Sequence, residues 1–338
     1  MEKMRLGKTG LSISRTAFGV LPLQRTPMAE AVRILRRAYE AGITFYDTAR
    51  AYTDSEEKLG NALSGVRDSI VIATKSGATD RDGVLRDLET SLRNLKTDHV
   101  DILQLHNPGA LPNPDDTGSS RAALAEAREQ GLIRFAGITN HSRGRAAEAV
   151  SSGLYDTLQF PLSYLSSDED LALIEQCRLA DMGIIAMKPL SGGLLNNARA
   201  SFAYLRQWEN VVPIWGIQRM SELEEFIDLE NNPPVLDDRL LEVISSDREE
   251  LGSEFCRACG YCLPCPADIP IPMAARMSLL LRRMPYQKFL EAEWEERMSR
   301  IEKCTECGHC RDNCPYGLDT PALLKKNLAD YREFRNQI

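Results

Sequence analysis

Short apolar runs alternate with amphipathic stretches along the chain as far as about residue 231. Between the apolar runs, apolar residues recur every three or four positions, which predicts helices over residues 28–40, 83–95, 121–130 and 168–181. The apolar runs have the length and composition of buried parallel strands. They cover residues 15–20, 43–46, 69–74, 100–105, 133–138, 157–160, 183–187 and 211–215. Eight strand-helix units in this length predict an α/β fold, the (β/α)8 TIM barrel.

A doubly wound open sheet is the competing fold for this pattern. It would call for a Gly-rich dinucleotide turn after the first strand, and no G-x-G-x-x-G occurs there. The barrel pattern ends at Asn231-Asn232-Pro233-Pro234, because proline cannot continue a helix and restricts the residue before it. We therefore expect a barrel domain over residues 1–232, a helical connector over 233–255 and a separate domain over 256–338.

The charge is unevenly distributed between these parts. Residues 1–255 carry 28 Lys and Arg against 38 Asp and Glu, and residues 256–338 carry 13 against 11. An acidic barrel with a near-neutral tail argues against nucleic acid as a partner. The N-terminus lacks a continuous apolar leader and no stretch reaches the length of a bilayer span, so we expect a cytoplasmic protein without a membrane partner.

Eight of the nine cysteines form two tight runs in the C-terminal part. The runs are Cys256, Cys259, Cys262, Cys265 and Cys304, Cys307, Cys310, Cys314. Thiolates repeating every three residues and closed by Cys-Pro suit a four-iron cluster, and the second run has the bacterial ferredoxin spacing. Structural zinc is the alternative, but zinc ribbons present two pairs of Cys separated by a longer stretch. Two [4Fe-4S] clusters are therefore predicted.

The fourth cysteine of each run in two-cluster ferredoxins ligates the other cluster. This rule predicts one cluster on Cys256, Cys259, Cys262 and Cys314, and a second on Cys304, Cys307, Cys310 and Cys265. The runs are separated by residues 266–303, with helical character over 273–283 and 286–300. That interval predicts a small, helix-rich, ferredoxin-like domain.

Four polar residues follow consecutive predicted strands: Asp47, Tyr52, Lys75 and His106. Strand ends of a barrel meet at one mouth, so these side chains are expected to converge. The chain here resembles the aldo-keto reductases. The resemblance rests on the segments FYDTARAY (45–52), ATK (73–75), DILQLH (101–106) and IRFAGITN (133–140).

The resemblance implies a catalytic tetrad for carbonyl reduction by a nicotinamide cofactor. Tyr52 would donate a proton to the carbonyl oxygen, and Lys75, held by Asp47, would favour the ionised phenol. His106 would donate a hydrogen bond to the substrate oxygen.

The same resemblance implies a cofactor site, in two groups of residues. Thr139, Asn140 and Gln159 match positions that hold the nicotinamide carboxamide. The phosphates would be held by Pro189, Leu190, Ser191, Gly192 and Gly193 after the seventh strand and by Gly216, Gln218 and Arg219 after the eighth. Met187 replaces an aromatic residue, and Glu222 stands where an Arg or Gln is usual, so NADP and NAD both remain open.

Two functions of different classes fit these motifs. The leading one is an NAD(P)-dependent oxidoreductase that interconverts a small-molecule carbonyl and alcohol, fused to an iron-sulfur electron-transfer domain with an external redox protein as partner. The alternative is an electron-transfer or redox-sensing protein whose barrel binds nicotinamide without turnover. The ninth cysteine, Cys177, lies in the apolar pattern of a helix and is expected to be a buried thiol.

Overall fold

The computed structural model describes residues 1–251, 255–258, 260–283, 286–314 and 316–338. Its contacts divide the chain into two compact units. The first comprises Met1–Pro189 and Ser201–Leu236, and the second comprises Leu190–Ala200 and Asp237–Ile338. Among the described residues, none of the helices has both the length and the apolar character to cross a membrane.

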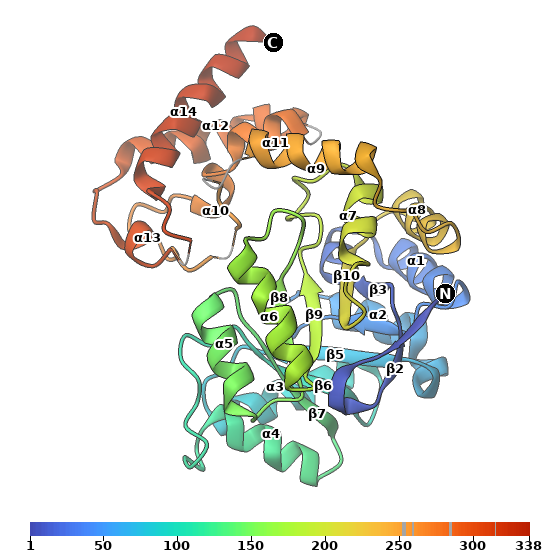
Figure 1. Ribbon diagram of the computed structural model, residues 1–338. Helices are drawn as coiled ribbons and strands as arrows, with labels where there is room; N and C mark the ends of the chain where they lie inside the picture. The colour runs from blue at the N-terminus through green and yellow to red at the C-terminus, as the bar shows by residue number, and fades with distance from the viewer. Residues whose placement is uncertain (252–254, 259, 284–285, 315) are drawn as a thin grey trace. The chain divides into compact units, whose positions relative to one another are not determined.

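Eight parallel strands close into a barrel in the first unit (Figure 1). The strands are β3 (Ala17–Gly19), β4 (Phe45–Asp47), β5 (Val71–Ser76), β6 (Val100–His106), β7 (Ile133–Thr139), β8 (Thr157–Pro161), β9 (Gly183–Met187) and β10 (Val211–Gly216). They pair in chain order, and β10 closes on β3. The predicted (β/α)8 barrel is confirmed, and each strand falls on one of the apolar runs.

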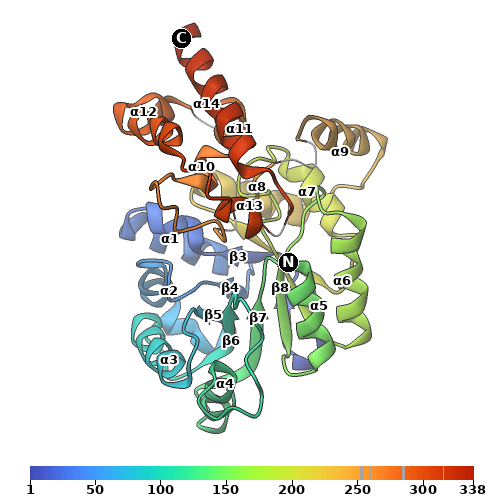
Figure 2. The same ribbon diagram turned by 90° about the vertical axis from the view of Figure 1, so that its left-hand side faces the viewer.

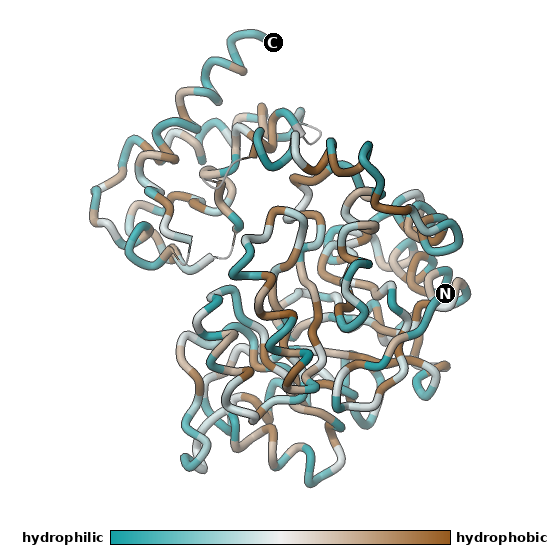
Figure 3. The backbone as a smooth tube through the Cα atoms, in the orientation of Figure 1, coloured by the Kyte–Doolittle hydropathy of each residue, from teal (hydrophilic) through white to brown (hydrophobic). Residues whose placement is uncertain are grey.

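Helices surround these strands, as Figure 2 shows for α1 to α6. The barrel helices are α1 (Met28–Glu40), α2 (Ser55–Leu63), α3 (Arg81–Leu95), α4 (Ser120–Glu129), α5 (Arg143–Ser152), α6 (Asp168–Leu179), α7 (Ala198–Leu205) and α8 (Met220–Asn231). Side-chain caps set several starts: Asp80 accepts from the Gly83 amide and therefore begins α3 two residues before the predicted position. Figure 3 shows the apolar segments concentrated on the strands and on inward helix faces.

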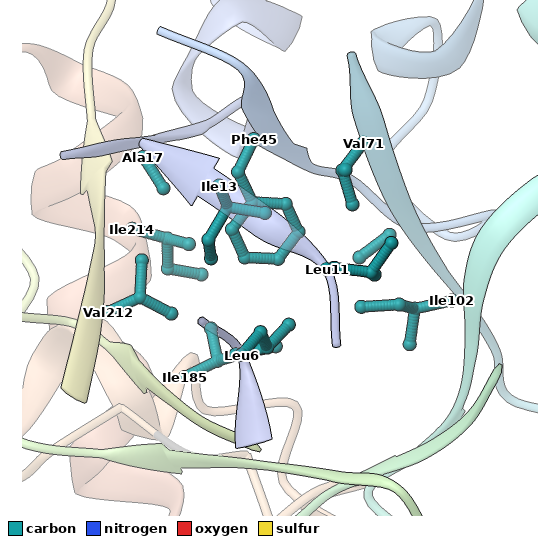
Figure 4. Packing of buried hydrophobic residues seen from close by; sticks show 11 residues of the cluster. Leu6, Leu11, Ile13, Ala17, Phe45, Val71, Ile102, Ile185, Val212 and Ile214 are labelled. Carbon is teal, nitrogen blue, oxygen red and sulfur yellow. The ribbon is translucent and has the colours of Figure 1, made fainter. Parts of the chain in front are cut away.

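A hairpin that the pattern did not predict closes one end of the barrel. Strands β1 (Lys3–Arg5) and β2 (Ser12–Ser14) pair antiparallel, and their apolar residues pack against the first residues of the barrel strands (Figure 4). Leu6, Leu11 and Ile13 meet Phe45 and Ile185 there. A Cβ on Gly183 would lie 2.7 Å from Leu6 Cγ, so only glycine admits this approach. The other end of the barrel is therefore the one available for chemistry.

The second unit consists of helices joined by turns and irregular segments in its described part. It contains α9 (Asp238–Leu251), α10 (Ile271–Ala274), α11 (Met277–Arg283), α12 (Ala292–Ser299), α13 (His309–Asp312) and α14 (Thr320–Gln337), with 3-10 turns at Gln287–Leu290 and Arg300–Lys303. Its core includes Phe289 and Tyr331, whose hydroxyl donates to the Phe289 carbonyl at 2.7 Å.

Two helices occupy the stretch for which a single helix over 273–283 was expected. The Arg276 amide bonds to the Met273 carbonyl in a tight turn, and the Ser278 amide bonds to the Asn327 side chain on α14 at 2.8 Å. The new helix α11 thus begins where a hydrogen bond to a distant residue is made. The local pattern of apolar residues does not predict such a bond.

Ile13→Ala should lower the free energy of unfolding of the barrel by about 2–5 kcal/mol, because it removes buried methyl groups from the closed end. Urea unfolding followed by tryptophan fluorescence, to which buried Trp215 contributes, measures this change. Leu179→Ala, at a residue 73% exposed, is the control and should change the free energy by less than about 0.5 kcal/mol. Equal effects of the two variants would contradict this role for the hairpin.

Candidate active site

The four predicted catalytic side chains meet at the carboxyl ends of β4, β5 and β6. Asp47 and His106 are the last residues of their strands, Lys75 lies near the end of β5, and Tyr52 lies between β4 and α2. The Lys75 Nζ donates to Asp47 Oδ2 at 2.5 Å and lies 5.1 Å from the Tyr52 ring centroid. The Tyr52 and His106 rings contact edge to face, with centroids 5.8 Å apart. The structure therefore brings all four together.

The pair formed by Lys75 and Asp47 is almost completely buried, at 2% exposure each. Lys75 also donates to the Thr48 carbonyl at 2.6 Å, and Gln104 donates from Nε2 to Asp47 Oδ1 at 3.1 Å. Burial is the largest single effect and lowers the pKa of Lys75, but Asp47 and Tyr52 together outweigh it, so the pKa of the ammonium is raised. Gln104 and Thr48 were not predicted as site residues. The sequence feature that pointed to Gln104 was its place on the same strand as His106.

The pKa of Tyr52 is raised, although Lys75 was expected to favour its ionised form. Burial is the largest cause and raises the pKa, while the charge of Lys75 and its hydrogen bond lower it and Asp47 raises it. The Lys75 contribution therefore has the expected sign but is outweighed. The phenol remains protonated at neutral pH, as a proton donor must be.

Buried ion pairs hold the loop that carries Tyr52. Lys58 on α2 donates to Asp54 Oδ1 and to the Leu23 carbonyl, both at 2.8 Å. Glu56 accepts from Thr74 at 2.7 Å and pairs with Arg50. These contacts fasten the β4–α2 loop to the neighbouring strand β5.

Two further residues that were given no catalytic role lie near His106. Burial lowers the pKa of His106 to about 4, with a further lowering by Lys75. Burial also lowers the pKa of His141 to about 3, with contributions from Lys188 and from His106. His141 and Lys188 therefore belong to the same mouth. His141 directly follows Asn140, a predicted cofactor residue, and Lys188 directly follows the strand predicted over 183–187. These positions were the sequence features that pointed to the mouth of the barrel.

The predicted nicotinamide residues lie at the end of β7 and within the neighbouring strand β8. Thr139, Asn140 and Gln159 are buried. Asn140 donates to the Pro108 carbonyl at 2.9 Å and accepts from the Ser142 amide at 2.8 Å. Gln159 Oε1 has no hydrogen-bond partner within the described residues. A buried acceptor without a donor suits a ligand amide, which fits the carboxamide of nicotinamide.

The predicted phosphate residues after β10 are anchored by an acidic side chain. The Glu222 carboxylate accepts from the Gln218 amide at 2.8 Å and the Arg219 amide at 3.1 Å, which caps α8. Gly216 is exposed at the end of β10. After β9, the first unit extends to Pro189. The following segment, Leu190–Ala200, belongs to the second unit and contains Ser191, Gly192 and Gly193. Ser191, Gly192 and Gly193 all have positive φ, in a compact turn.

The described cysteines of the two runs line two cavities of the second unit. One is lined by Cys262, Cys265, Cys304, Cys307 and Cys310. The other is lined by Cys256, Cys262, Cys310 and Cys314. Cys259 lies outside the described residues. No three His, Cys, Asp or Glu among the residues described are grouped as ligands of one metal ion.

Cys177 on α6 takes no part in either cavity. It is buried, and burial raises the pKa of its thiol to about 12. The thiol therefore stays protonated and unreactive, as expected from the sequence.

The structure is a (β/α)8 TIM barrel in which a buried ion pair, a phenol and an imidazole meet at the carboxyl ends of the strands, where enzymes of this fold carry their active sites. Residues 14–210 match the model of the aldo/keto reductase family. The chain belongs to this family. Residues 255–319 match the 4Fe-4S dicluster domain.

Two curated proteins and one solved structure are similar to this chain. The chain is 32% identical over 211 residues to an uncharacterized oxidoreductase, YqkF, of Bacillus subtilis, covering 58% of this chain and 67% of that protein. It is 31% identical over 214 residues to L-galactose dehydrogenase of Arabidopsis thaliana, with the same coverage. The fold matches an aldo-keto reductase of Klebsiella pneumoniae solved with NADPH, at 21% identity and a TM-score of 0.63, covering 72% of this chain and 94% of that one.

The depressed pKa of His106 predicts that the imidazole stays neutral down to about pH 4. The unfolded chain, with a His pKa of about 6.5, binds this proton more readily. The contribution of His106 to stability is therefore present above pH 6.5 and is lost as the pH falls through the window to about 4. An NMR titration measures the pKa, and His106→Gln should flatten the fall of unfolding free energy in this window. A His106 resonance that titrates near 6.5 would contradict this environment.

Proposed function

We propose that the barrel interconverts the carbonyl and alcohol groups of a small molecule by hydride transfer with a nicotinamide cofactor. The observation that carries this proposal is the contact of Tyr52 with both Lys75 and His106 at the carboxyl ends of the strands. These groups can protonate and orient an oxygen atom, and they are set where barrel enzymes hold their substrates. Bound nicotinamide would supply the hydride, which no side chain of the chain can provide.

Tyr52 is the proposed proton donor. Its phenol is protonated at neutral pH, and negative charge developing on a substrate oxygen would draw its proton. The phenolate left behind would lie beside the Lys75 ammonium, which Asp47 keeps charged. The buried pair therefore stabilises the state that forms as the proton moves.

His106 is the proposed orienting group. With a pKa of about 4, its imidazole is neutral at physiological pH and carries one N–H donor. A neutral donor can bind the substrate oxygen without competing with Tyr52 as the acid. The edge-to-face contact of the two rings fixes His106 relative to Tyr52.

The cofactor would be held by the residues that the resemblance named. Gln159, with its free buried oxygen, and Asn140 would bind the carboxamide, and Thr139 lies beside them on β7. Pro189, Leu190, Ser191, Gly192, Gly193, Gly216, Gln218 and Arg219 are the proposed phosphate contacts.

We propose NAD rather than NADP as the preferred cofactor. Glu222 places a carboxylate on the amides at the start of α8, where a helix would otherwise favour an anion. The Glu222 carboxylate already offsets the positive end of the α8 dipole. A 2′-phosphate bound there would be repelled by the negative charge of Glu222.

The second unit is proposed to hold two [4Fe-4S] clusters with crossed ligation. Cys265 lines the cavity of Cys304 and Cys307, whereas Cys314 lines the cavity of Cys256, as the crossing requires. Cys262 and Cys310 border both cavities. An external redox protein would be the electron partner of these clusters, because nicotinamide gives up a hydride whereas a cubane takes one electron at a time.

Tyr52→Phe should reduce turnover of an aldehyde or ketone substrate by about two to four orders of magnitude, because only the proton donor is lost. Nicotinamide binding, followed by fluorescence titration, should change little. Tyr39→Phe, on α1, is a matched control and should leave both unchanged. Wild-type turnover by the Tyr52 variant would refute the assignment.

Glu222→Gln should shift the preference toward NADP by about fivefold to thirtyfold in the ratio of dissociation constants, because it removes a like charge but keeps an acceptor for the cap. Titration of both nucleotides measures the ratio. Glu225→Gln, an exposed position on the same helix, is the control and should leave it unchanged. An unaltered ratio for Glu222→Gln would show that this carboxylate does not set the preference.

Crossed ligation can be tested by double substitution. The intact chain should hold about eight iron atoms, and Cys256→Ala or Cys314→Ala alone should each lose about four. The Cys256→Ala, Cys314→Ala double variant should lose no more than either single variant, whereas Cys256→Ala with Cys265→Ala should lose all the iron. Cys177→Ala is the control. The reverse pattern in anaerobic iron and sulfide analysis would establish uncrossed ligation.

A further inference from the structure

Arg276 is a buried cation that the fold of the second unit does not explain. It lies between α10 and α11 and is only 5% exposed. Within the described part of the chain, it forms no ion pair with a carboxylate, and its Nε has no hydrogen-bond partner. A buried charge without a partner is unfavourable, so the site implies an anionic neighbour.

Among the described residues, the anionic group that acts on Arg276 is the thiolate of Cys256, a proposed cluster ligand. Cys256 Sγ lies 3.9 Å from the Pro272 carbonyl oxygen, one helical turn before Arg276, and accepts from the Ala258 amide at 3.4 Å. Burial lowers the pKa of Arg276, and charge on Cys256 raises it. The guanidinium and the sulfur therefore influence each other through the interior of the unit.

The other contact of Arg276 is with the loop that follows β9. Its Nη2 donates to the Gly192 carbonyl at 3.0 Å. Gly192 has a φ of 68°, and a Cβ there would lie 3.2 Å from Arg276 Nη1. A side chain at this position would be strained and would crowd the guanidinium. One side chain thus connects the loop at 190–193 with the surroundings of Cys256.

We propose that Arg276 tunes the reduction potential of the cluster held by Cys256, and that its bond to Gly192 makes this potential respond to a pyrophosphate bound at residues 190–193. The second half rests on the proposed nicotinamide function. Reduction adds one electron, taken from an external one-electron reductant, and no proton needs to move because the guanidinium stays charged. A fixed positive charge in a low-dielectric interior stabilises the added negative charge. A bound pyrophosphate, carrying negative charge, would offset it.

EPR-monitored potentiometric titration of the full anaerobic holoprotein tests the tuning. Arg276→Gln and Arg276→Met remove the charge and should each make reduction of one cluster at least tenfold less favourable, which is about 59 mV for one electron. Arg276→Lys keeps the charge and should stay near the wild-type value. Arg282→Gln, at an exposed arginine of α11 that pairs with Asp330, is the matched control and should change neither cluster.

A wild-type potential in cluster-loaded Arg276→Gln and Arg276→Met would overturn the tuning. So would an equal shift in Arg276→Lys, since geometry rather than charge would then be responsible. Iron content and far-UV circular dichroism of each variant establish that the compared proteins are loaded and folded.

ADP-ribose tests the response to nucleotide, because it carries the pyrophosphate and cannot accept a hydride. Saturating ADP-ribose should lower the potential of the same cluster in the wild type, and less so in Arg276→Gln. Binding without any shift would overturn the coupling. If neither ADP-ribose nor NAD binds in a fluorescence titration, the proposed nicotinamide function is overturned instead. The tuning by Arg276 is unaffected by that result, because it is measured without nucleotide.

Discussion

The buried ion pair between Lys75 and Asp47 is the interaction on which the candidate active site depends. Removing both charges from water is costly, and their attraction repays this only when the remaining donors and acceptors are also satisfied. Thr48 and Gln104 supply those contacts. Three adjacent strands, β4, β5 and β6, must therefore be in register before the pair is stable. The geometry of the candidate active site therefore depends on the pairing of the barrel strands.

Acidic residues at the two ends of β6 and β4 illustrate how position decides their role. Asp101, near the start of β6, accepts from Arg67 at 2.8 Å and from the Ile72 amide at 2.9 Å. It binds neighbouring elements together at the end of the barrel closed by the hairpin. Asp47, at the carboxyl end of β4, instead holds the Lys75 ammonium beside Tyr52. Both carboxylates are buried and paired, and their place along the strand separates the structural role of Asp101 from the proposed catalytic role of Asp47.

The second unit follows a different principle, in which clusters rather than a large apolar core would organise the chain. Apart from α9 and α14, its helices are short and are separated by turns, and no strands pair among its described residues. Contacts such as that of the Tyr331 hydroxyl with the Phe289 carbonyl join these pieces, and the described cysteines of the two runs line two cavities among them. Iron-sulfur ligation would therefore contribute directly to folding, as metal binding does in other small domains.

The barrel, its eight strands, the convergence of the four candidate catalytic residues and the grouping of the cysteines could all be predicted from the amino-acid sequence. Apolar runs have to be buried, and residues after consecutive parallel strands have to share one edge, so local pattern carries this information. The sequence did not predict the hairpin that closes the barrel, the break between α10 and α11 or the contacts of Gln104 and Arg276. Each of these depends on a partner distant in sequence, such as Gly183, Asn327, Asp47 or Gly192. The direction of the Tyr52 pKa shift also depends on the tertiary structure. Burial, which raises this pKa, outweighs the effect of Lys75, the neighbour identified from the sequence, which lowers it.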